Sequence, residues 1–206
     1  MHVADAATDP RDSLTRETAM PHSIDLANHQ LVALTRASLA ALRGALVRDA
    51  GPAAATYLQE AGYAGGESLF ASFAAWLRDQ GEGPPEQLDV PTFERRASEY
   101  FRDAGWGTLA IGTLQEAVAT LDSSDWGEAD PASALDHPAC HLTTGMFADF
   151  FGRIADHPLA VLEVECRSAG DARCRFLIGN ADVMGHVYDE MGRGAAYGAA
   201  VAVVSE

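Results

Sequence analysis

The sequence contains no lysine: all 14 of its basic residues are arginine, against 30 Asp and Glu, and the formal net charge is −16 at pH 7. Nucleic-acid binding depends on a basic face, so a charge of this sign argues against that class of partner. The missing lysine also excludes the G-x-x-x-x-G-K-[ST] phosphate loop. We interpret the acidic balance as that of a well-solvated surface.

Long apolar runs are also missing. No run approaches the roughly 20 residues that a membrane-spanning helix needs, and the tract at residues 195–204 is interrupted by Gly198. The start of the chain is polar and acidic and lacks the apolar segment of a signal peptide. We therefore expect a cytoplasmic protein with a flexible leader over residues 1–24 and one domain over residues 25–206, long enough to bury a sizeable core.

Motifs for catalysis and for nucleotide cofactors are absent too. Gly192, Gly194 and Gly198 have the wrong spacing for a dinucleotide-binding turn, and the sequence has no G-x-S-x-G or H-E-x-x-H element. A reductase needs a nicotinamide or flavin site, and no motif for either is visible. The sequence therefore favours a protein without catalytic activity.

Cysteine is scarce, and all three cysteines lie close together near the end of the chain. Cys140, Cys166 and Cys174 form, with Glu163, a C-x22-E-x2-C-x7-C pattern. Zinc favours tetrahedral sites built from thiolates, imidazoles and carboxylates, so the pattern indicates a metal site. Two other interpretations are a set of small buried core residues and a Cys166–Cys174 disulfide, which requires an oxidising compartment.

The local pattern places these residues on a helix and a hairpin. Cys140 follows Asp136 and Pro138, a cap and a first-turn proline for a helix that continues through residue 154. Residues 159–166 and 173–178 are rich in strand formers and flank a turn at Gly170. A hairpin centred there brings Cys166 opposite Cys174.

Local pattern alone does not decide which acidic residue joins the three cysteines as the fourth ligand. Side chains alternate along a strand, so Glu163 and Glu165 share one face and Cys166 takes the other. Glu163 joins Cys166 only if the strand bulges, and Glu165 and Asp171 are rivals. His141 is a further rival, but adjacent helical residues point about 100° apart.

The whole chain predicts an α+β fold. Helices are expected at residues 26–48, 52–62, 67–78, 91–103, 140–154 and 183–191. Strands are expected at residues 106–114 and 116–121, and in the hairpin at 159–178. Helices followed by four short strands, with one helix inserted, predict N-terminal helices on a four-stranded antiparallel sheet.

Residues 122–176 resemble the 4-vinyl-reductase-type domain, which occurs in bacteriochlorophyll-biosynthesis accessory proteins and as the sensory domain of phenol- and xylene-responsive activators. The matching pieces are Asp122-Ser123, Glu128-Ala129, Pro138-Ala-Cys140, Thr144-Gly145, Phe150-Phe-Gly-Arg153, Glu163-Val-Glu-Cys166 and Gly170-Asp-x-x-Cys-x-Phe176. Upstream, over residues 31–121, the resemblance rests on helix pattern and on Gly105-Trp-Gly107.

The resemblance implies a zinc site and a ligand cavity. In the phenol-sensing branch a Cys, a Glu and two further Cys at this spacing bind zinc, which selects Cys140, Glu163, Cys166 and Cys174. The fold is implied to be that of TRAPP tethering subunits and haem-based nitric-oxide sensors, with dimers formed through the N-terminal helices. The haem-sensing relatives need a Tyr-x-Ser-x-Arg element, which is absent here, so haem is not expected.

The implied apolar cavity lies between the Cys140 helix, the strands at 106–121 and the helix at 91–103. Phe147, Phe150 and Phe151 form a helical stripe, which is typical of a plain core as well as of a pocket wall. Thr120 stands where the phenol sensors carry an aromatic residue, so phenol itself is not the expected ligand. The candidate ligand-binding residues are Tyr100, Trp106, Thr120, Phe147, Phe150 and Phe151.

Three functions compete at this point. The first is a zinc-stabilised, homodimeric domain that binds a small hydrophobic or aromatic molecule for sensing or delivery. The second is an accessory protein of bacteriochlorophyll synthesis, as a tetrapyrrole carrier or a helper of 8-vinyl reduction. The third is a TRAPP-like adaptor for another protein. The phenol sensors continue into an ATPase and a DNA-binding domain, which have no counterpart here, so we do not expect activation of transcription by this chain alone.

Overall fold

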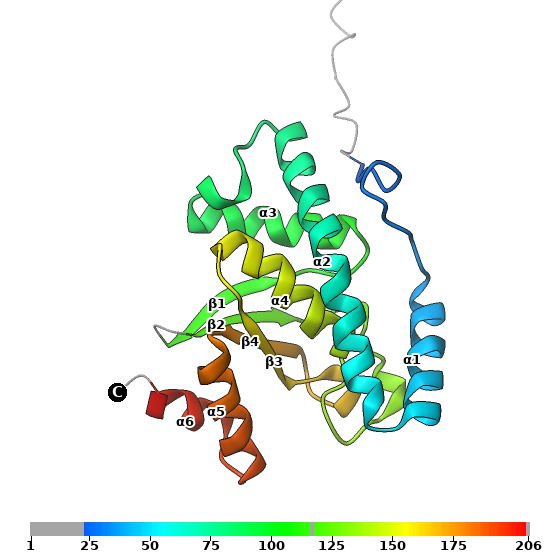
Figure 1. Ribbon diagram of the computed structural model, residues 1–206, viewed down its shortest axis with the longest axis vertical. Helices are drawn as coiled ribbons and strands as arrows, with labels where there is room; N and C mark the ends of the chain where they lie inside the picture. Colours follow the sequence, from blue (N-terminus) through cyan, green and yellow to red (C-terminus); the bar gives the residue numbers. More distant parts are fainter. Residues whose placement is uncertain (1–22, 116–117, 205–206) are drawn as a thin grey trace, which may run out of the picture.

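The computed structural model describes residues 23–115 and 118–204. It has the expected α+β class, with helices around a four-stranded antiparallel sheet (Figure 1). The leader expected over residues 1–24 lies almost entirely outside the described residues. The helices are α1 (Arg36–Ala50), α2 (Ala53–Asp79), α3 (Val90–Asp103), α4 (His141–Ala155), α5 (Ala181–Gly192) and α6 (Tyr197–Val204). Short 3₁₀ turns are η1 (Pro85–Gln87), η2 (Pro131–Ser133) and η3 (Arg167–Ala169).

The sheet has the strand order β1-β2-β4-β3, and every neighbouring pair is antiparallel. The strands are β1 (Ala110–Gln115), β2 (Val118–Ser123), β3 (Ala160–Glu165) and β4 (Cys174–Gly179). Helix α4 lies between β2 and β3 in the chain. It is the inserted helix that the sequence predicts. The β3–β4 hairpin turns through η3 and Gly170, whose φ of 94° suits glycine.

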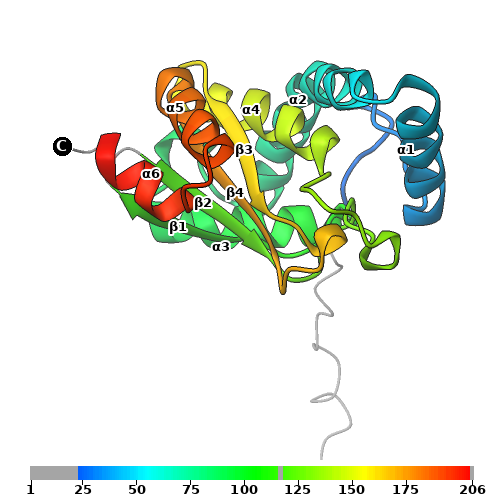
Figure 2. The same ribbon diagram turned by 90° about the horizontal axis from the view of Figure 1, so that it is seen from below.

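The two faces of the sheet carry two separate cores, because side chains alternate along each strand. Leu121 and Phe176 face the larger core, which α2, α3 and α4 cover with interlocking aromatic rings. Val118 and Leu177 face a smaller core beneath α5 and α6, on the other side of the sheet (Figure 2). Tyr197, Ala200 and Val201 of α6 belong to the second core or pack against it, in a part of the chain for which no element was expected.

Helix α2 is continuous, whereas the sequence suggested a break at Gly65 and Gly66. Gly62 of α2 and Gly145 of α4 permit close packing of these two helices. A Cβ at Gly62 would lie 2.0 Å from the Leu142 carbonyl oxygen, and a Cβ at Gly145 would lie 1.9 Å from that of Gln59. The two helix backbones therefore meet at these positions, where no side chain fits.

The first helix is shorter than the expected range of 26–48, since α1 begins at Arg36 with Thr35 as its N-cap. Residues 23–35 form an irregular segment beside α2 (Figures 1 and 2). Leu69, Phe73 and Trp76 of α2, one of the N-terminal helices through which the resemblance implies dimers, lie in the larger core. Among the described residues, no helix combines the length and apolarity needed to cross a membrane.

Candidate metal centre

Cys140, Glu163, Cys166 and Cys174 converge in one buried cluster. One ligand atom from each residue lies within 4.8 Å of all the others. The Cys140 sulfur is 3.8 Å from that of Cys166 and 4.0 Å from that of Cys174. These are not disulfide lengths, and all three cysteines are free. Sulfurs around a tetrahedral zinc, each about 2.3 Å from the metal, stand about 3.8 Å apart, so the cluster could hold such an ion.

A β-bulge turns Glu163 toward the cysteines. The register of β3 on β4 shifts between Glu163 and Glu165, so the strand leaves the strict alternation that would separate Glu163 from Cys166. Glu163 Oε2 accepts a hydrogen bond from the Cys140 amide at 2.7 Å, while buried Oε1 has no partner among the described residues. A buried carboxylate oxygen without a partner fits the role of a metal ligand.

Two of the three rivals for the fourth ligand make other hydrogen bonds, and the third lies outside the cluster. Glu165 accepts hydrogen bonds from Arg173 at 2.8 and 3.1 Å and from the Tyr197 hydroxyl at 2.6 Å. Asp171 accepts a hydrogen bond from the Cys166 amide at 2.7 Å, so its carboxylate stabilises the turn. His141 is outside the cluster, and burial, followed by the charge of Arg43, lowers the pKa of its imidazole.

The cluster favours one thiolate even without a metal. Hydrogen bonding with the side chain of Cys140, and then with that of Cys174, lowers the pKa of Cys166. The same contact with Cys166 raises the pKa of Cys140. Burial, and then the negative charge at Cys166, raises the pKa of Glu163 to about 9. Bringing so many acidic groups together is unfavourable unless a cation accompanies them.

The structure corrects the expected position of Cys140. This residue is the N-cap of α4 and not a member of its first turn, and its own side chain makes no capping hydrogen bond. Glu128 caps the helix instead: its carboxylate accepts from the Leu142 amide at 3.1 Å and the Thr143 amide at 2.7 Å. Its carboxylate at the helix N-terminus also complements the helix dipole. The Cys140 side chain is therefore left to point at the other cysteines.

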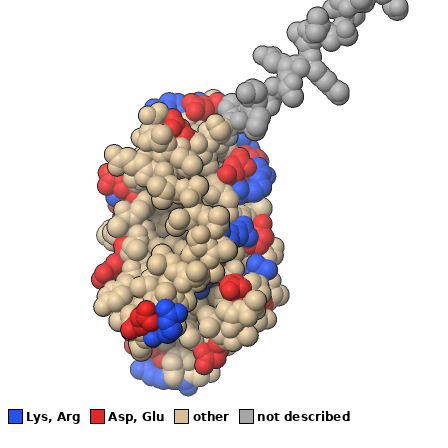
Figure 3. Space-filling view, turned by 90° about the vertical axis from the view of Figure 1, so that its right-hand side faces the viewer, with Lys and Arg blue, Asp and Glu red and all other residues tan. Residues whose placement is uncertain are grey.

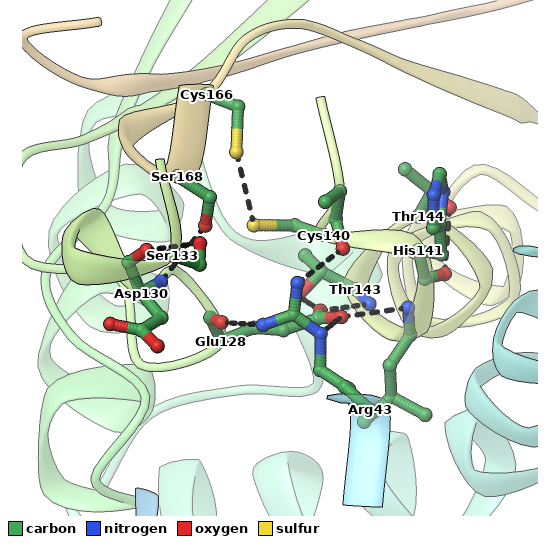
Figure 4. A network of polar contacts seen from close by, with 12 residues as sticks. Arg43, Glu128, Asp130, Ser133, Cys140, His141, Thr143, Thr144, Cys166 and Ser168 are labelled. Atoms are coloured by element: carbon green, nitrogen blue, oxygen red, sulfur yellow. Dashed lines mark hydrogen bonds and ion pairs between the residues drawn. The ribbon is translucent and has the colours of Figure 1, made fainter. Parts of the chain in front are cut away.

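Helix α1 reaches this region through Arg43, which is buried. Arg43 Nη2 donates to the Ala139 carbonyl at 2.7 Å, Nη1 donates to the Glu128 carbonyl, and Nε lies 3.4 Å from the Glu128 carboxylate (Figure 4). Sequence reasoning assigned no role to Arg43 or to the Glu128 side chain. Glu128 was quoted only as part of the family resemblance, and nothing in the pattern of α1 distinguishes Arg43 from its other arginines.

The turn between β3 and β4 is held by a second set of polar contacts. Ser168 lies in η3 and is fully buried, and its hydroxyl oxygen accepts a hydrogen bond from the Asp130 amide at 2.9 Å. Its carbonyl accepts from the Leu135 amide at 2.8 Å. The segment that leads to Cys140 is thus tied to the hairpin that carries Cys166 (Figure 4).

The candidate ligand-binding aromatics form a packed network. Trp106 stacks on Trp126 with centroids 5.6 Å apart, Trp126 contacts Phe147 at 5.1 Å, and Phe147 contacts Phe151 at 5.5 Å. The ring contacts continue to the two remaining candidates, Tyr100 and Phe150. Rings in such contact fill the space between helices and sheet, so no open cavity separates them. Ligand binding by these residues stays a prediction.

Thr120 is separated from that network. Its register partners are Gly112 and Leu177, and Leu177 belongs to the core beneath α5 and α6. Directly paired residues share a face of a sheet, so Thr120 lies on the opposite side from Phe147 and Phe150. One of the six candidates, Trp106, lines an open pocket.

That pocket, which we call the Trp106 pocket, has a volume of about 220 Å³. Its walls come from the irregular N-terminal segment, from α2, from the start of α4 and from the end of α3, and its lining is apolar. It is larger than the about 150 Å³ cavity known to hold benzene. The lining residues are Ile24, Leu26, Leu31, Val32, Ala61, Gly62, Gly65, Leu69, Ala104, Trp106, Leu142 and Met146.

A second opening, of about 650 Å³, lies between α2, α4, β3 and α5 and reaches Glu163. Polar side chains line it together with apolar ones, among them Gln59, His141 and Asp189. Through this opening, solvent can approach Glu163, one of the four residues of the cluster. The cysteine side of the cluster is by contrast fully buried, since Cys140, Cys166 and Cys174 each have an exposed fraction of 0%.

Comparison with known proteins relates this fold and site to one class of domain. Residues 128–180 match the model of the V-4-R domain, the 4-vinyl-reductase-type family, and this span contains all four residues of the cluster. The match confirms the resemblance found for residues 122–176. No curated protein matches the sequence.

Several solved structures are similar, including the following three. The phenol-responsive sensory domain of the transcription activator PoxR, solved with phenol, matches at 17% identity and a TM-score of 0.59, covering 74% of this chain and 77% of that one. A trafficking protein particle complex subunit 3 from Naegleria fowleri, covalently bound to palmitic acid, matches at 11% identity and 0.52, covering 70% and 91%. A vinyl-4-reductase family protein from Methanocaldococcus jannaschii matches at 20% identity and 0.45, covering 61% and 68%. The first two confirm the fold class.

Proposed function

We propose that this chain is a zinc-stabilised domain without catalytic activity, which binds a small hydrophobic or aromatic molecule for sensing or delivery. The observation that carries the proposal is the buried convergence of three thiols and the unpaired oxygen of Glu163. Soft thiolate ligands select zinc over magnesium or calcium, which prefer oxygen. Four protein ligands fill a tetrahedral site and leave no position for a substrate, so the role is structural.

The ligand site is proposed at the Trp106 pocket and the aromatic residues behind it. Apolar lining without a charged group suits a molecule that binds by burial of its own apolar surface. Two proteins of this fold were solved with molecules of that kind, phenol and palmitic acid. The N-terminal segment forms one wall of the pocket, so a bound molecule contacts the segment that leads into α1.

A homodimer is part of the proposal. Figure 3 shows the side of the molecule that carries α1 and α2: charged side chains lie around its margin, and the middle is uncharged and hollowed. Exposed apolar side chains on the N-terminal segment, α1 and α2 support contact with a second copy. They are Leu26, Val32, Leu34, Leu42, Val47, Tyr57 and Tyr63.

The decisive experiment for the metal is elemental analysis of the purified protein, together with two matched variants. Glu163→Gln removes the fourth ligand, whereas Glu165→Gln makes the same chemical change two residues along the same strand. We expect one zinc per wild-type chain, weaker zinc binding by Glu163→Gln and wild-type zinc binding by Glu165→Gln. Protein purified without zinc that also fails to bind added zinc would refute the proposal.

Mass spectrometry of an organic extract of the purified protein tests the ligand. A small apolar molecule supports the proposed function. A bound tetrapyrrole, recognisable by its colour, would instead support an accessory role in bacteriochlorophyll synthesis. A protein partner that co-purifies in stoichiometric amount, with no extracted molecule, would support a TRAPP-like adaptor.

A further inference from the structure

We infer that Arg43 is a positioning residue of the metal centre, through which the docking of α1 controls how firmly the metal is held. This inference rests on the proposed zinc site. It concerns a residue on a helix that contributes no ligand and lies almost 100 positions before Cys140 in the sequence.

Arg43 acts on the peptide unit that carries Cys140. The carbonyl of Ala139 and the amide of Cys140 belong to the same planar group, and they point to opposite sides of it. Arg43 Nη2 donates to that carbonyl at 2.7 Å, and the amide donates to Glu163 Oε2, also at 2.7 Å. The backbone of the first thiol ligand is therefore held between an arginine on one side and the carboxylate ligand on the other.

Arg43 also fixes the cap of α4. Its guanidinium contacts both the carbonyl and the carboxylate of Glu128, whose carboxylate oxygens accept from the Leu142 and Thr143 amides. One arginine thus fixes the two features that determine where the Cys140 sulfur lies, namely its own peptide unit and the start of its helix (Figure 4). A guanidinium suits this role because its donors are spread over a rigid plane, which lysine cannot reproduce.

Two arginines of helix α1 bond to the rest of the domain. Arg36 and Arg43 stand seven positions apart, which places them on one helix face. Arg36 donates to the carbonyls of Asp125 at 3.3 Å and Gly105 at 3.1 Å. On the same helix Leu42 and Val47 are 52% and 49% exposed, and Arg43 is the one residue of α1 that is buried. A change in the position of α1 therefore moves Arg43, and with it the Ala139–Cys140 peptide.

The test measures the rate at which zinc passes from the loaded protein to a chromophoric chelator. Arg43→Lys keeps the charge and removes the planar fork, and we expect release about tenfold faster, because removal of a group that orients a metal ligand typically costs about 10–100-fold in metal affinity. Arg48→Lys is the matched control, since Arg48 pairs with its neighbour Asp49 on the surface, and its release rate should equal that of the wild type.

The variant Arg36→Lys distinguishes the docking of α1 from the direct contacts that Arg43 makes with Glu128 and Ala139. Arg36→Lys keeps the Arg43 side chain and weakens the attachment of α1 to Asp125 and Gly105, so we expect release faster than in the wild type and slower than in Arg43→Lys. Release at the wild-type rate in Arg36→Lys would overturn the control by α1. Release at the wild-type rate in Arg43→Lys would overturn the positioning role itself.

Hydrogen exchange provides the reciprocal measurement, because a coupling between two sites acts in both directions. Removal of zinc should speed exchange of the α1 amides while those of α5, on the other face of the sheet, keep their rates. Equal rates in α1 with and without zinc would contradict the coupling. A wild-type protein that binds no zinc would instead refute the metal site, so the two failures are distinguishable. If Arg43→Lys does not fold, the Arg36→Lys and exchange experiments decide.

Discussion

Glu163 and Glu165 lie two positions apart on β3, and their carboxylates make different contacts because a bulge separates them. Glu163 points one oxygen at the Cys140 amide and leaves the other unpaired beside the sulfurs. Glu165 joins a partly exposed network with Arg173 and Tyr197. One irregularity in the strand therefore converts one of two otherwise equivalent carboxylates into a candidate metal ligand.

The first prediction is that the stabilisation by zinc grows with pH. Metal ligands must be deprotonated, so bound zinc depresses the pKa values of these groups in the folded state. Stability from such a shift is present above the unfolded-state pKa and is lost as pH falls. We expect zinc in about 100-fold excess over its Kd to add about 2.7 kcal/mol at pH 8, and to add little at pH 5.

The metal-free protein supplies the reference for that prediction. There the raised pKa of Glu163, about 9, contributes stability that is lost as pH rises toward that value. The lowered pKa of Cys166 contributes stability that is lost as pH falls. Between about pH 5 and 9 these two contributions to the free energy of unfolding change with pH in opposite directions. We therefore expect the stability of the metal-free protein to depend little on pH through this pair. Thermal unfolding of both forms from pH 5 to 8 makes the measurement, and a constant difference between their Tm values would contradict it.

The second prediction concerns the crossing of α2 and α4. Gly145→Ala places a methyl group where the Gln59 carbonyl oxygen is 1.9 Å away, and backbone cannot yield as a flexible side chain does. The helices must separate, so we expect a loss of about 1–3 kcal/mol, as for overpacked cores. Gly185→Ala is the control, because a Cβ in α5 at that position meets nothing within 4 Å. This variant should gain up to about 1 kcal/mol from helix propensity. Urea unfolding measures both.

The fold and the convergence of four residues in one cluster could be predicted because they depend on local pattern and on a shared motif. Strand formers around Gly170 predicted the hairpin, and the cysteine spacing, read through the family resemblance, selected the four residues that converge. The glycines of α2 were misread as breaks, because a glycine that ends a helix and one that admits a neighbouring helix look alike in sequence. Which of the two applies at Gly62 depends on Leu142, 80 positions later.

Arg43 and the Glu128 cap were beyond the reach of sequence reasoning for the same reason. A capping residue is normally sought directly before its helix, and Glu128 lies 13 positions before His141, the first residue of α4. Thr120 shows the converse difficulty. Its position in the resemblance suggested a pocket wall, and the strand register, which no local pattern determines, turns it to the other side of the sheet.

The third prediction is that the protein forms a homodimer through the side that carries α1 and α2. Leu42→Glu combined with Val47→Glu places two charges on the exposed face of α1, so the variant should be monomeric if that face is the interface. Val203→Glu on α6 is the control, since Val203 is equally apolar and 65% exposed. Light scattering at micromolar concentration gives the masses. A wild-type monomer, or a double variant that keeps the dimer mass, would contradict the prediction.

The fourth prediction is that Gly65→Leu blocks the Trp106 pocket without disturbing the fold. Gly65 lines the pocket, and a Cβ there meets nothing within 4 Å, so the added side chain has room to enter the pocket. Replacing a helical glycine also favours the helix by up to about 1 kcal/mol. We therefore expect weaker binding of an apolar fluorescent probe, together with an unchanged zinc content and an equal or higher Tm. Gly185→Leu makes the same exchange in α5, far from the pocket, and should bind the probe as the wild type does. Equal probe binding by wild type and Gly65→Leu would show that the ligand lies elsewhere, either among the buried aromatic rings or in the opening beside Glu163.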